Sequence, residues 1–371
     1  MRFLILVNNY PVEQPVYAER FVHARVSEYI KTHECLVASF KVPSDYIFEG
    51  VQVVRLQNEA HFYTILNEYR PDRILVHFAL KRIIRMLQPV DKKIIVWVHG
   101  YEALGWYRRW FELKNTGIFS SGFVRKVISN MSQQYTLRRF IQRSNHTPSI
   151  VFVFVSRWMC RMTESDTFSR ILYKKIIPNP IDDRCFTYSP KPDDHRFHIL
   201  IIRPFTSSKY ALDMVRDTIL GLSNEPGFEK LKFTIYGQGP DWERITAAFK
   251  PFNNIRLHNH LMNKTALAEV FFNHGIFLCP TRQDAQGVTM CEAMSCGLVP
   301  ITSANTGIPE FVQDGYSGYT TTSVNEMILR IKQLVARADL FQTLSGQAAQ
   351  SIRKKAGIAD IINSELSLIM S

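Results

Sequence analysis

Two carboxylate side chains, those of Asp284 and Glu292, lie eight positions apart around a single glycine, Gly287. The apolar run at residues 275–279 before them predicts a buried parallel strand. Residues 288–296 predict a helix that begins just after the glycine. A strand that ends in a glycine-bearing turn and opens a helix suits an anion, because the first helical amides are free and the helix dipole favours negative charge there. This segment is therefore the first candidate for chemistry.

The residues of this turn have separate candidate roles. The backbone amides of Gly287, Val288 and Thr289 are predicted to hold a phosphate group. Glu292, one turn into the helix, is placed to reach a ribose, and Asp284, before the turn, is placed to reach a second polar group. Carboxylates also occur near helix starts as simple caps that face solvent. A capped helix without a ligand is therefore the alternative.

The same segment resembles the retaining glycosyltransferases of family four. Members of that family carry an acidic residue, seven others and a glutamate, followed by Ala-Met and a Gly-x-x-Pro turn. Here these elements are Asp284, Glu292, residues 293–294 and residues 297–300. Asp284 departs from the family, which usually has the longer Glu at this position. The resemblance implies that Glu292 holds the ribose of a nucleotide and that Asp284 contacts the hydroxyls of a donor sugar.

Two cations, Arg203 and Lys209, follow a predicted strand at residues 197–202. They resemble the basic pair that clamps the donor diphosphate in this family. Breaking the bond to the anomeric carbon places negative charge on the leaving diphosphate, and fixed cations stabilise that charge most in the transition state. The glycine that usually precedes the arginine is Ile202 here, and the spacing to the lysine is one residue longer. Two solvated cations without a ligand are the alternative.

Two further positions resemble site residues of the family. His99 follows a predicted strand at residues 93–98, at the edge where open α/β sheets bind their ligands. The resemblance implies that His99 contacts the donor sugar, and a loop histidine bonded to nearby backbone is the alternative. Gly237 lies in a Gly-x-Gly turn after another strand. It is predicted either to let a nucleotide approach the backbone closely or to serve only the turn.

The elements that position these residues alternate between short apolar strands and helices in two rounds, which is typical of α/β folds. The predicted strands are residues 3–7, 34–40, 52–56, 73–77, 93–98 and 150–155, then 197–202, 232–236, 255–257, 276–279, 299–302 and 318–320. Helices are predicted near residues 17–31, 59–69, 79–88, 121–143, 157–165 and 359–370. With 371 residues, 46% of them hydrophobic, the chain is long enough to bury two cores.

This organisation resembles the GT-B fold, in which two Rossmann-like domains face each other across a cleft and a C-terminal helix crosses back to the first domain. We expect an acceptor-binding domain at residues 1–190 and a nucleotide-sugar-binding domain at residues 191–345. Residues 346–371 are expected to form the helices that return towards the first domain. The turn at residues 178–182 resembles the family's hinge at the end of that domain.

The net charge of +12 is unevenly distributed along the chain. Between residues 106 and 143, which we call the basic segment, cations alternate with aromatic residues; they are Arg108, Arg109, Lys114, Arg125, Lys126, Arg138, Arg139 and Arg143, with Trp106, Tyr107, Trp110, Phe111, Phe119 and Phe123. An anionic membrane surface is the favoured partner, because anionic lipid attracts clustered cations and aromatic rings settle at the interface. A solvated helix face is one alternative. Nucleic acid is disfavoured, since no recognisable nucleic-acid module accompanies the segment.

The cysteines and the apolar runs bear on location. The six cysteines show no close-set pairs typical of a metal site, which predicts a reduced, cytosolic environment. The apolar start at residues 1–7 is too short for a signal peptide, and no later run reaches the roughly 18 apolar residues of a spanning helix. We therefore expect a cytoplasmic protein that is peripheral at the inner face of the cell membrane.

Together these features predict a retaining glycosyltransferase that moves a sugar from a UDP or GDP donor to a saccharide or lipid-linked acceptor in bacterial cell-envelope polysaccharide synthesis. The nucleotide sugar is a substrate, and no cofactor or metal is expected. The sequence has no Asp-x-Asp triplet, and Arg203 with Lys209 would supply the positive charge. Two alternatives are a non-catalytic nucleotide-sugar-binding module and a nucleotide-sugar epimerase of the same fold.

Overall fold

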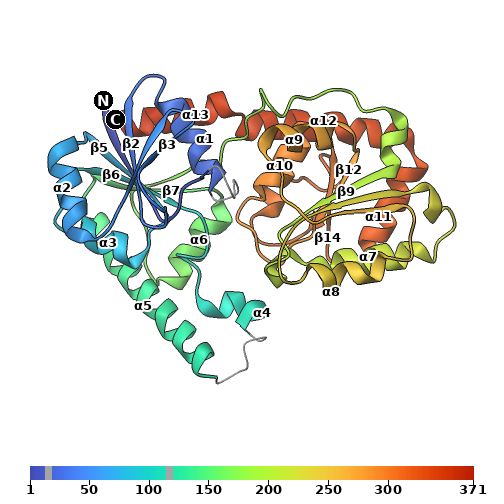
Figure 1. Ribbon diagram of the computed structural model, residues 1–371, viewed down its shortest axis with the longest axis horizontal. Helices are drawn as coiled ribbons and strands as arrows, with labels where there is room; N and C mark the ends of the chain where they lie inside the picture. Colours follow the sequence, from blue (N-terminus) through green and yellow to red (C-terminus); the bar gives the residue numbers. More distant parts are fainter. Residues whose placement is uncertain (13–18, 114–119) are drawn as a thin grey trace. The chain divides into compact units, whose positions relative to one another are not determined.

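The computed structural model describes residues 1–12, 19–113 and 120–371 of the chain (Figure 1). Contacts divide these residues into two compact units. Unit 1 comprises Met1–Pro180 together with Ala359–Ser371, and unit 2 comprises Ile181–Ile358. The boundaries predicted from the sequence, at residues 190 and 345, both lie within unit 2.

The described residues of unit 1 form an eight-stranded sheet in the order β3-β4-β2-β1-β5-β6-β7-β8. The strands are β1 (Arg2–Val7), β2 (Glu34–Ser39), β3 (Tyr46–Phe48), β4 (Val51–Arg55), β5 (Arg73–His77), β6 (Lys93–Val98), β7 (Ile150–Phe154) and β8 (Lys174–Ile176). Neighbouring strands are parallel, except that β3 and β4 form an antiparallel edge. The central strands are buried almost throughout, as expected where helices cover both faces of a parallel sheet.

The helices of unit 1 come from both ends of the chain. They are α1 (Arg20–Tyr29), α2 (Glu59–Tyr69), α3 (Lys81–Leu87), α4 (Trp110–Leu113), α5 (Ser121–Ser144), α6 (Arg157–Asp166) and the C-terminal α13 (Ile358–Met370). Figure 1 shows α5 reaching away from the sheet. Arg73 Nε donates to the carbonyl oxygen of Ile369 at 2.8 Å, and Trp97 Nε1 donates to Glu365 Oε1 at 3.1 Å. The last helix therefore packs on unit 1, as the predicted fold requires.

The described residues of unit 2 form a six-stranded, parallel sheet in the order β11-β10-β9-β12-β13-β14. Its strands are β9 (His198–Ile202), β10 (Lys232–Tyr236), β11 (Ile255–His258), β12 (Ile276–Leu278), β13 (Val299–Ser303) and β14 (Tyr319–Thr321). Its helices are α7 (Leu212–Ser223), α8 (Trp242–Thr246), α9 (Lys264–Phe272), α10 (Val288–Ser295), α11 (Val324–Ala336) and α12 (Ala338–Ala356). Alternate residues of β9 enter different clusters: Ile199 and Ile201 enter one, Leu200 and Ile202 the other. Both faces of this sheet are therefore buried.

Each strand predicted from the sequence is present, and each end lies within one residue of its predicted position. The predictions miss β3 and β8, the two edge strands of unit 1. Each has only three residues, and neither β3 nor β8 is buried along its length. An edge strand pairs on one side only, so it needs no long apolar run and gives a weak signal in the sequence.

Candidate functional site

The sheet of unit 2 has a topological switch point between β9 and β12. From β9 the chain continues outward through β10 and β11, and it then crosses to β12, β13 and β14 on the other side. Loops after the two strands at such a point leave in opposite directions, and open α/β sheets bind ligands there. Arg203 follows β9, Gly237 follows β10 and Asp284 follows β12. The topology therefore brings these predicted residues to the same edge of one sheet.

Arg203 is almost fully buried, with 5% of its surface exposed. Its Nη2 donates a hydrogen bond to the carbonyl oxygen of Cys279 at 2.7 Å, which joins the loops after β9 and β12. Its Nε is buried and has no hydrogen-bond partner among the described residues. A guanidinium keeps its charge, and a buried donor without a partner is costly. The unpaired Nε therefore points to an anionic ligand at this edge.

Lys209 lies in a short 3-10 turn, Ser208–Tyr210, between β9 and α7. Its Nζ is 4.7 Å from the centre of the Tyr210 ring, and the guanidinium carbon of Arg203 is 5.9 Å from the same centre. The carbonyl oxygen of Lys209 accepts a hydrogen bond from the backbone amide of Arg282 at 2.8 Å. The structure thus brings the two predicted cations together beside Tyr210, a residue that the sequence analysis did not single out.

Gly237 supports the loop that carries Arg203. A Cβ atom at this position would lie 2.2 Å from the carbonyl oxygen of Arg203 and 2.5 Å from the ring of Phe205. The two loops are also hydrogen-bonded: the amide of Arg203 donates to Tyr236 O at 3.2 Å, and the amide of Phe205 donates to Gln238 O at 2.9 Å. Close packing of backbone on backbone therefore requires glycine here.

Asp284 and Gly287 form a closed turn before α10. Asp284 Oδ1 accepts hydrogen bonds from the amides of Gln286 at 3.1 Å and Gly287 at 2.8 Å. Gly287 has a φ of 75°, a left-handed conformation that favours glycine. Its amide is engaged by Asp284, in contrast to the predicted role in binding a phosphate. Since α10 begins at Val288, the amides of Val288 and Thr289 have no carbonyl one turn earlier in the helix and are available to donate to a ligand.

Glu292 lies one turn into α10 and is partly exposed, whereas its neighbours Cys291 and Ala293 are buried. Burial raises the pKa of the Cys291 thiol well above its ordinary value, and the negative charges of Asp284 and Glu292 raise this pKa further. Both carboxylates therefore lie close enough to act on one buried thiol. The structure brings the predicted pair together around the start of α10.

His99 follows β6 in unit 1. Its Nε2 is 3.0 Å from His77 Nδ1, and its own Nδ1 is buried without a hydrogen-bond partner among the described residues. Burial, and after it the charge of Arg25, lowers the pKa of His99 well below the ordinary value, so the ring is neutral at neutral pH. Glu102, which the sequence analysis missed, is fully buried and accepts hydrogen bonds from the amides of His99 at 2.6 Å and Gly100 at 3.0 Å.

The residues at the switch point of unit 2 lie in a segment that matches a known family. Residues 196–337 match the model of the family described as Glycosyl transferases group 1. We call this matched segment the group 1 domain. This group 1 domain contains most of the predicted site residues, namely Arg203, Lys209, Gly237, Asp284, Gly287, Val288, Thr289 and Glu292. His99 lies outside it, in unit 1.

A curated relative matches part of the chain. The chain is 26% identical over 129 residues to the N-acetyl-alpha-D-glucosaminyl L-malate synthase of Bacillus anthracis. The match covers 33% of this chain and 32% of the relative, so it spans well under half of either protein.

Solved structures extend the likeness beyond the group 1 domain to nearly the whole chain. Sucrose-phosphate synthase from Thermosynechococcus elongatus has a TM-score of 0.75 at 12% identity, over 99% of this chain and 98% of that one. Anabaena HepE, solved in complex with UDP and glucose, has a TM-score of 0.72 at 15% identity, over 100% of both chains. WaaG, a glycosyltransferase involved in lipopolysaccharide biosynthesis, has a TM-score of 0.71 at 12% identity, over 100% of this chain and 99% of that one. The chain therefore has the two-domain α/β fold of GT-B glycosyltransferases.

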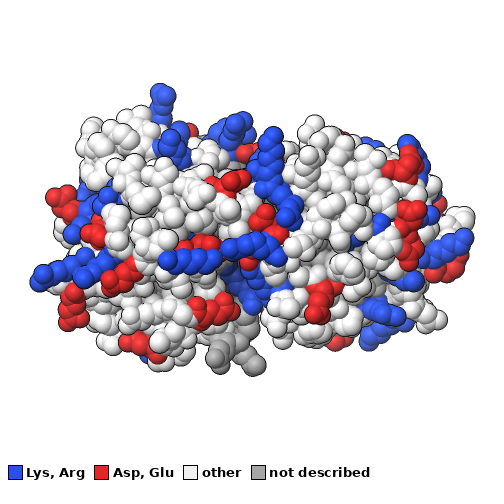
Figure 2. Space-filling view, turned by 90° about the horizontal axis from the view of Figure 1, so that it is seen from above, with Lys and Arg blue, Asp and Glu red and all other residues white. Residues whose placement is uncertain are grey.

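The basic segment lies outside the group 1 domain, and some of its charges are paired. Arg108 Nε donates to Asp166 Oδ1 at 2.7 Å, and Arg109 Nε donates to Glu112 Oε2 at 2.9 Å. Lys114 falls outside the described residues. On the face drawn in Figure 2, cations are spread over both units and are interspersed with acidic side chains. The positive charge of the protein is therefore not confined to the basic segment.

Several aromatic residues of the basic segment pack on one another. The rings of Trp106, Trp110 and Phe123 form a cluster in which the centres lie 6.0 to 6.5 Å apart. Phe123 is buried, with 7% of its surface exposed. Phe119 falls outside the described residues. Some of the aromatic residues that were predicted to lie at a membrane interface therefore pack α4 against α5 instead.

Helix α5 carries an exposed apolar stripe that was not predicted from the sequence. Val124, Ile128, Met131 and Tyr135 are 43%, 60%, 59% and 62% exposed. Their spacing of four, three and four residues places them on one helix face, a signal that the sequence contained. Arg138 and Arg139 are exposed on the same helix. Among the described helices, none is both long and apolar enough to cross a membrane.

Proposed function

We propose that this chain is a retaining glycosyltransferase that moves a sugar from a UDP or GDP donor to a saccharide or lipid-linked acceptor. The observation that carries the proposal is Arg203, a nearly buried cation with an unpaired Nε at the switch point of a group 1 domain. The side chains of Arg203 and Lys209 both lie beside the ring of Tyr210. Two fixed cations at one point suit the diphosphate of a nucleotide sugar.

In the proposed reaction the bond between the anomeric carbon and the diphosphate breaks. The anomeric carbon bonds to an acceptor oxygen on the same face of the sugar, and the acceptor proton leaves with the nucleoside diphosphate. Negative charge grows on the diphosphate as its bond breaks, so Arg203 and Lys209 bind the transition state more tightly than the ground state. Because these side chains supply positive charge, the proposed reaction needs neither a metal nor a cofactor.

The remaining residues would position the donor. The amides of Val288 and Thr289 would hold the phosphates or the sugar, and Glu292 would hold the ribose. Asp284 uses Oδ1 in its own turn, which leaves Oδ2 for the sugar hydroxyls. His99 would orient the donor sugar through a neutral ring. A neutral ring with a depressed pKa is poorly suited to carry charge, so we assign His99 a positioning role.

The relatives and α5 support the proposed donor, pathway and location. HepE was solved with UDP and glucose, which supports a UDP sugar as the first donor to test. WaaG is involved in lipopolysaccharide biosynthesis, which supports a role in bacterial cell-envelope polysaccharide synthesis. The apolar stripe on α5, together with Arg138 and Arg139, supports a cytoplasmic enzyme bound to the inner face of the membrane.

Thermal unfolding in the presence of UDP, GDP, ADP, CMP and their sugars tests the donor site, because a ligand bound only by the folded state raises Tm. We expect at least one nucleotide to raise the Tm of the wild type and of Lys250→Ala, which removes an exposed cation that precedes β11. The same nucleotide should fail to raise the Tm of Arg203→Ala or Lys209→Ala, and EDTA should leave the wild-type shift unchanged. If no nucleotide shifts the wild type, the proposal is wrong.

Transfer assays separate the alternatives. A donor converted to a new sugar nucleotide without any acceptor would identify an epimerase. A donor that binds but is never turned over, with any acceptor or by hydrolysis, would identify a binding module. NMR of the product tests retention directly, because the proposed reaction keeps the anomeric configuration of the donor and an inverted product contradicts it.

A further inference from the structure

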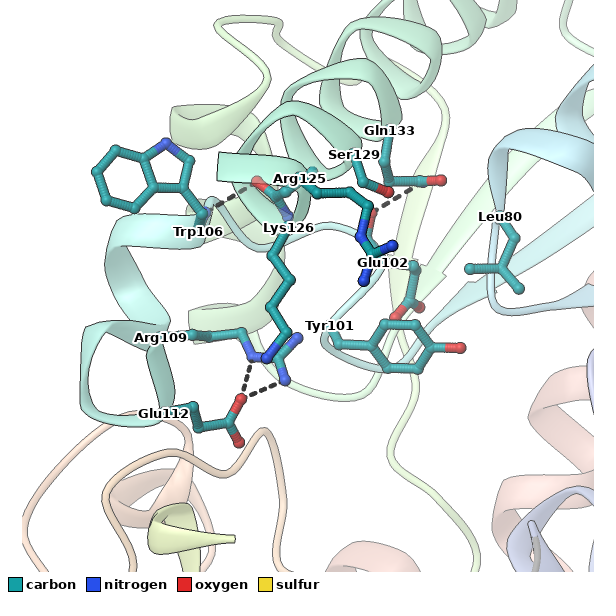
Figure 3. Close-up of a pocket in the computed structure, with 11 residues that line it drawn as sticks. Leu80, Tyr101, Glu102, Trp106, Arg109, Glu112, Arg125, Lys126, Ser129 and Gln133 are labelled. Atoms are coloured by element: carbon teal, nitrogen blue, oxygen red, sulfur yellow. Dashed lines mark hydrogen bonds and ion pairs between the residues drawn. The ribbon is translucent and has the colours of Figure 1, made fainter. Parts of the chain in front are cut away.

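Unit 1 contains a pocket of about 580 Å³ next to the loop that carries His99 (Figure 3). Four segments line it: Leu80 just before α3, the loop after β6, the short turn with α4, and the first half of α5. The side chains that decide its chemistry are Tyr101, Glu102, Trp106, Arg109, Arg125 and Lys126. Its size is within the range of small-ligand sites. The proposed donor chemistry in the group 1 domain does not use it.

Hydrogen bonds fix the walls of this pocket to one another. Gln133 on α5 donates from Nε2 to the carbonyl oxygens of Ala79 at 2.9 Å and Glu102 at 3.0 Å. Asn130, one turn earlier, accepts a hydrogen bond from the amide of Trp106 at 2.8 Å. Helix α5 is thus tied to the loops on both sides of the pocket. The pocket is therefore formed in advance of any ligand, which lowers the entropic cost of binding.

The charged side chains of the pocket are predominantly positive. Arg109 donates to Glu112 and is neutralised by it. Arg125 and Lys126 are exposed, and the side chain of neither forms an ion pair or hydrogen bond within the part of the chain that the structure describes. Glu102 is fully buried, and burial raises its pKa to about 7, so it is partly protonated at neutral pH. Figure 3 shows Arg125 extending from α5 towards Glu102, and Lys126 extending from α5 towards Arg109 and Glu112. An anion in this space would meet two uncompensated cations.

Aromatic rings connect the pocket with His99. Tyr101 is 42% exposed, and its ring stacks on Phe78 with the centres 5.5 Å apart. Phe78 in turn contacts His99, with the centres 4.7 Å apart. Trp106 lies on the other wall and is partly buried. Tyr and Trp offer a flat apolar face with a polar tip, which suits a sugar ring that has both apolar and hydroxyl-bearing sides.

The pocket and the apolar stripe use opposite faces of α5. Lys126, Ser129 and Gln133 line the pocket and follow one another at helical spacing. Val124, Ile128, Met131 and Tyr135 lie about half a turn away around the helix. A bilayer in contact with the stripe would therefore meet the side of α5 that faces away from the pocket. The anion that the pocket receives should belong to a saccharide and not to a membrane lipid.

We propose that this pocket binds an acceptor saccharide that carries a phosphate or carboxylate group, with Arg125 and Lys126 holding the anion and Tyr101 and Trp106 holding the sugar ring. The assignment as an acceptor site rests on the proposed glycosyltransferase function. It narrows the acceptor from any saccharide or lipid-linked saccharide to an anionic one. It also places the anion beside the loop of His99, which would contact the donor sugar.

Isothermal titration at low salt tests this with four soluble probes: glucose 1-phosphate, glucose 6-phosphate, glucuronate and the uncharged methyl α-glucoside. We expect at least one anionic probe to bind the wild type more tightly than methyl α-glucoside. The double variant Arg125→Ala/Lys126→Ala should weaken that binding by roughly tenfold or more, since each charge-assisted hydrogen bond contributes strongly. Arg138→Ala/Arg139→Ala removes the same charge from the same helix outside the pocket and should leave the affinity unchanged.

Arg203→Ala separates this pocket from the donor site. It should abolish the nucleotide-induced rise in Tm and leave the binding of the anionic sugar intact, whereas the pocket variant should show the reverse. Equal weakening by the two double variants, loss of sugar binding in Arg203→Ala, or no binding of any anionic probe would each overturn the pocket assignment. Vesicles of phosphatidylglycerol that compete with the sugar would also overturn it, because they would identify a lipid ligand.

Discussion

Arg25 on α1 donates a hydrogen bond from Nε to Oε1 of Glu365 on α13 at 2.8 Å, and neither side chain is exposed. The partners of this pair are also buried: Tyr29 donates its hydroxyl to Glu365 Oε2 at 2.5 Å, and Arg25 Nη2 donates to Asn179 Oδ1 at 2.9 Å. The ion pair joins two residues that are 340 positions apart in the sequence. It therefore fixes the C-terminal helix to unit 1.

Removing one partner of this pair should destabilise the protein. Glu365→Ala leaves the Arg25 guanidinium buried without its counter-charge, and such changes typically cost about 3–5 kcal/mol in the free energy of unfolding. Urea denaturation measures the change. Glu225→Ala, which removes the partner of exposed Lys332, is the matched control and should cost less than about 1 kcal/mol. Similar losses of unfolding free energy in both variants would show that the buried Arg25–Glu365 pair contributes no more to stability than an exposed pair.

The apolar strands and the helix after Gly287 could be predicted because each is a local pattern in the sequence. The Arg25–Glu365 pair could not, because two charges on amphipathic helices are normally expected to face solvent. The same holds for Asp284: its spacing from Glu292 indicates a site, but only coordinates reveal that Oδ1 closes the turn onto Gly287. Tyr210 and Glu102 carried no motif of their own. They can be recognised only from the structure, in which Tyr210 lies beside Arg203 and Glu102 accepts a hydrogen bond from the amide of His99.

Substituting alanine for Gly237 should disturb the donor site through the backbone. The added Cβ would clash with the carbonyl oxygen of Arg203, and the clash can be relieved only if the backbone moves. Overpacking of this kind typically lowers the free energy of unfolding by about 1–3 kcal/mol. We expect Gly237→Ala to lower Tm and to lose most of the nucleotide-induced rise in Tm. Gly346→Ala on α12 is the control, because its Cβ would make only an ordinary contact with Tyr188. A Gly237→Ala variant that binds nucleotide like the wild type would refute a packing role for this glycine.

Two carboxyl groups, those of the buried Glu102 and the partly buried Glu19, should make the protein less stable as the pH rises. Burial raises the pKa of Glu19 to about 8 and that of Glu102 to about 7 from the ordinary 4.5, and the charge of Glu102 contributes to the shift of Glu19. Between the ordinary pKa of 4.5 and these raised values, the folded protein keeps protons that the unfolded chain has released. Stability is therefore fully present below the unfolded pKa and is lost as the pH rises towards 8, by up to about 1.4 kcal/mol per pH unit for each group.

Urea denaturation between pH 5 and pH 8 measures this dependence, with the pH range set by the pKa values of Glu19 and Glu102. Glu19→Gln should flatten the loss of stability, most clearly at the upper end of the range. Glu34→Gln, at an exposed carboxylate, should leave the slope as it is in the wild type. An unchanged dependence of stability on pH in Glu19→Gln would mean that the pKa of Glu19 is not raised in the folded protein.

The apolar stripe should bind anionic membranes. We expect wild-type protein to sediment with vesicles that contain phosphatidylglycerol and not with pure phosphatidylcholine at low salt, because each cation near an anionic surface contributes about 1 kcal/mol. Ile128→Asp/Met131→Asp should abolish sedimentation, and Arg138→Ala/Arg139→Ala should weaken it. Leu329→Asp, at an exposed apolar residue of α11, should have no effect. Equal, negligible sedimentation with both lipids would remove the membrane proposal without affecting the donor site.

The central claim is that Arg203 and Lys209 stabilise a departing diphosphate. Acceptor-free release of nucleoside diphosphate from the bound sugar nucleotide measures this most directly, because it follows the breaking of the anomeric bond alone. Lys209→Ala should slow this release by about a hundredfold or more, as expected for losing one preorganised group that stabilises transition-state charge, while Lys250→Ala keeps the wild-type rate. A Lys209→Ala enzyme that remains folded and releases nucleoside diphosphate at the wild-type rate would contradict the proposed role of Lys209.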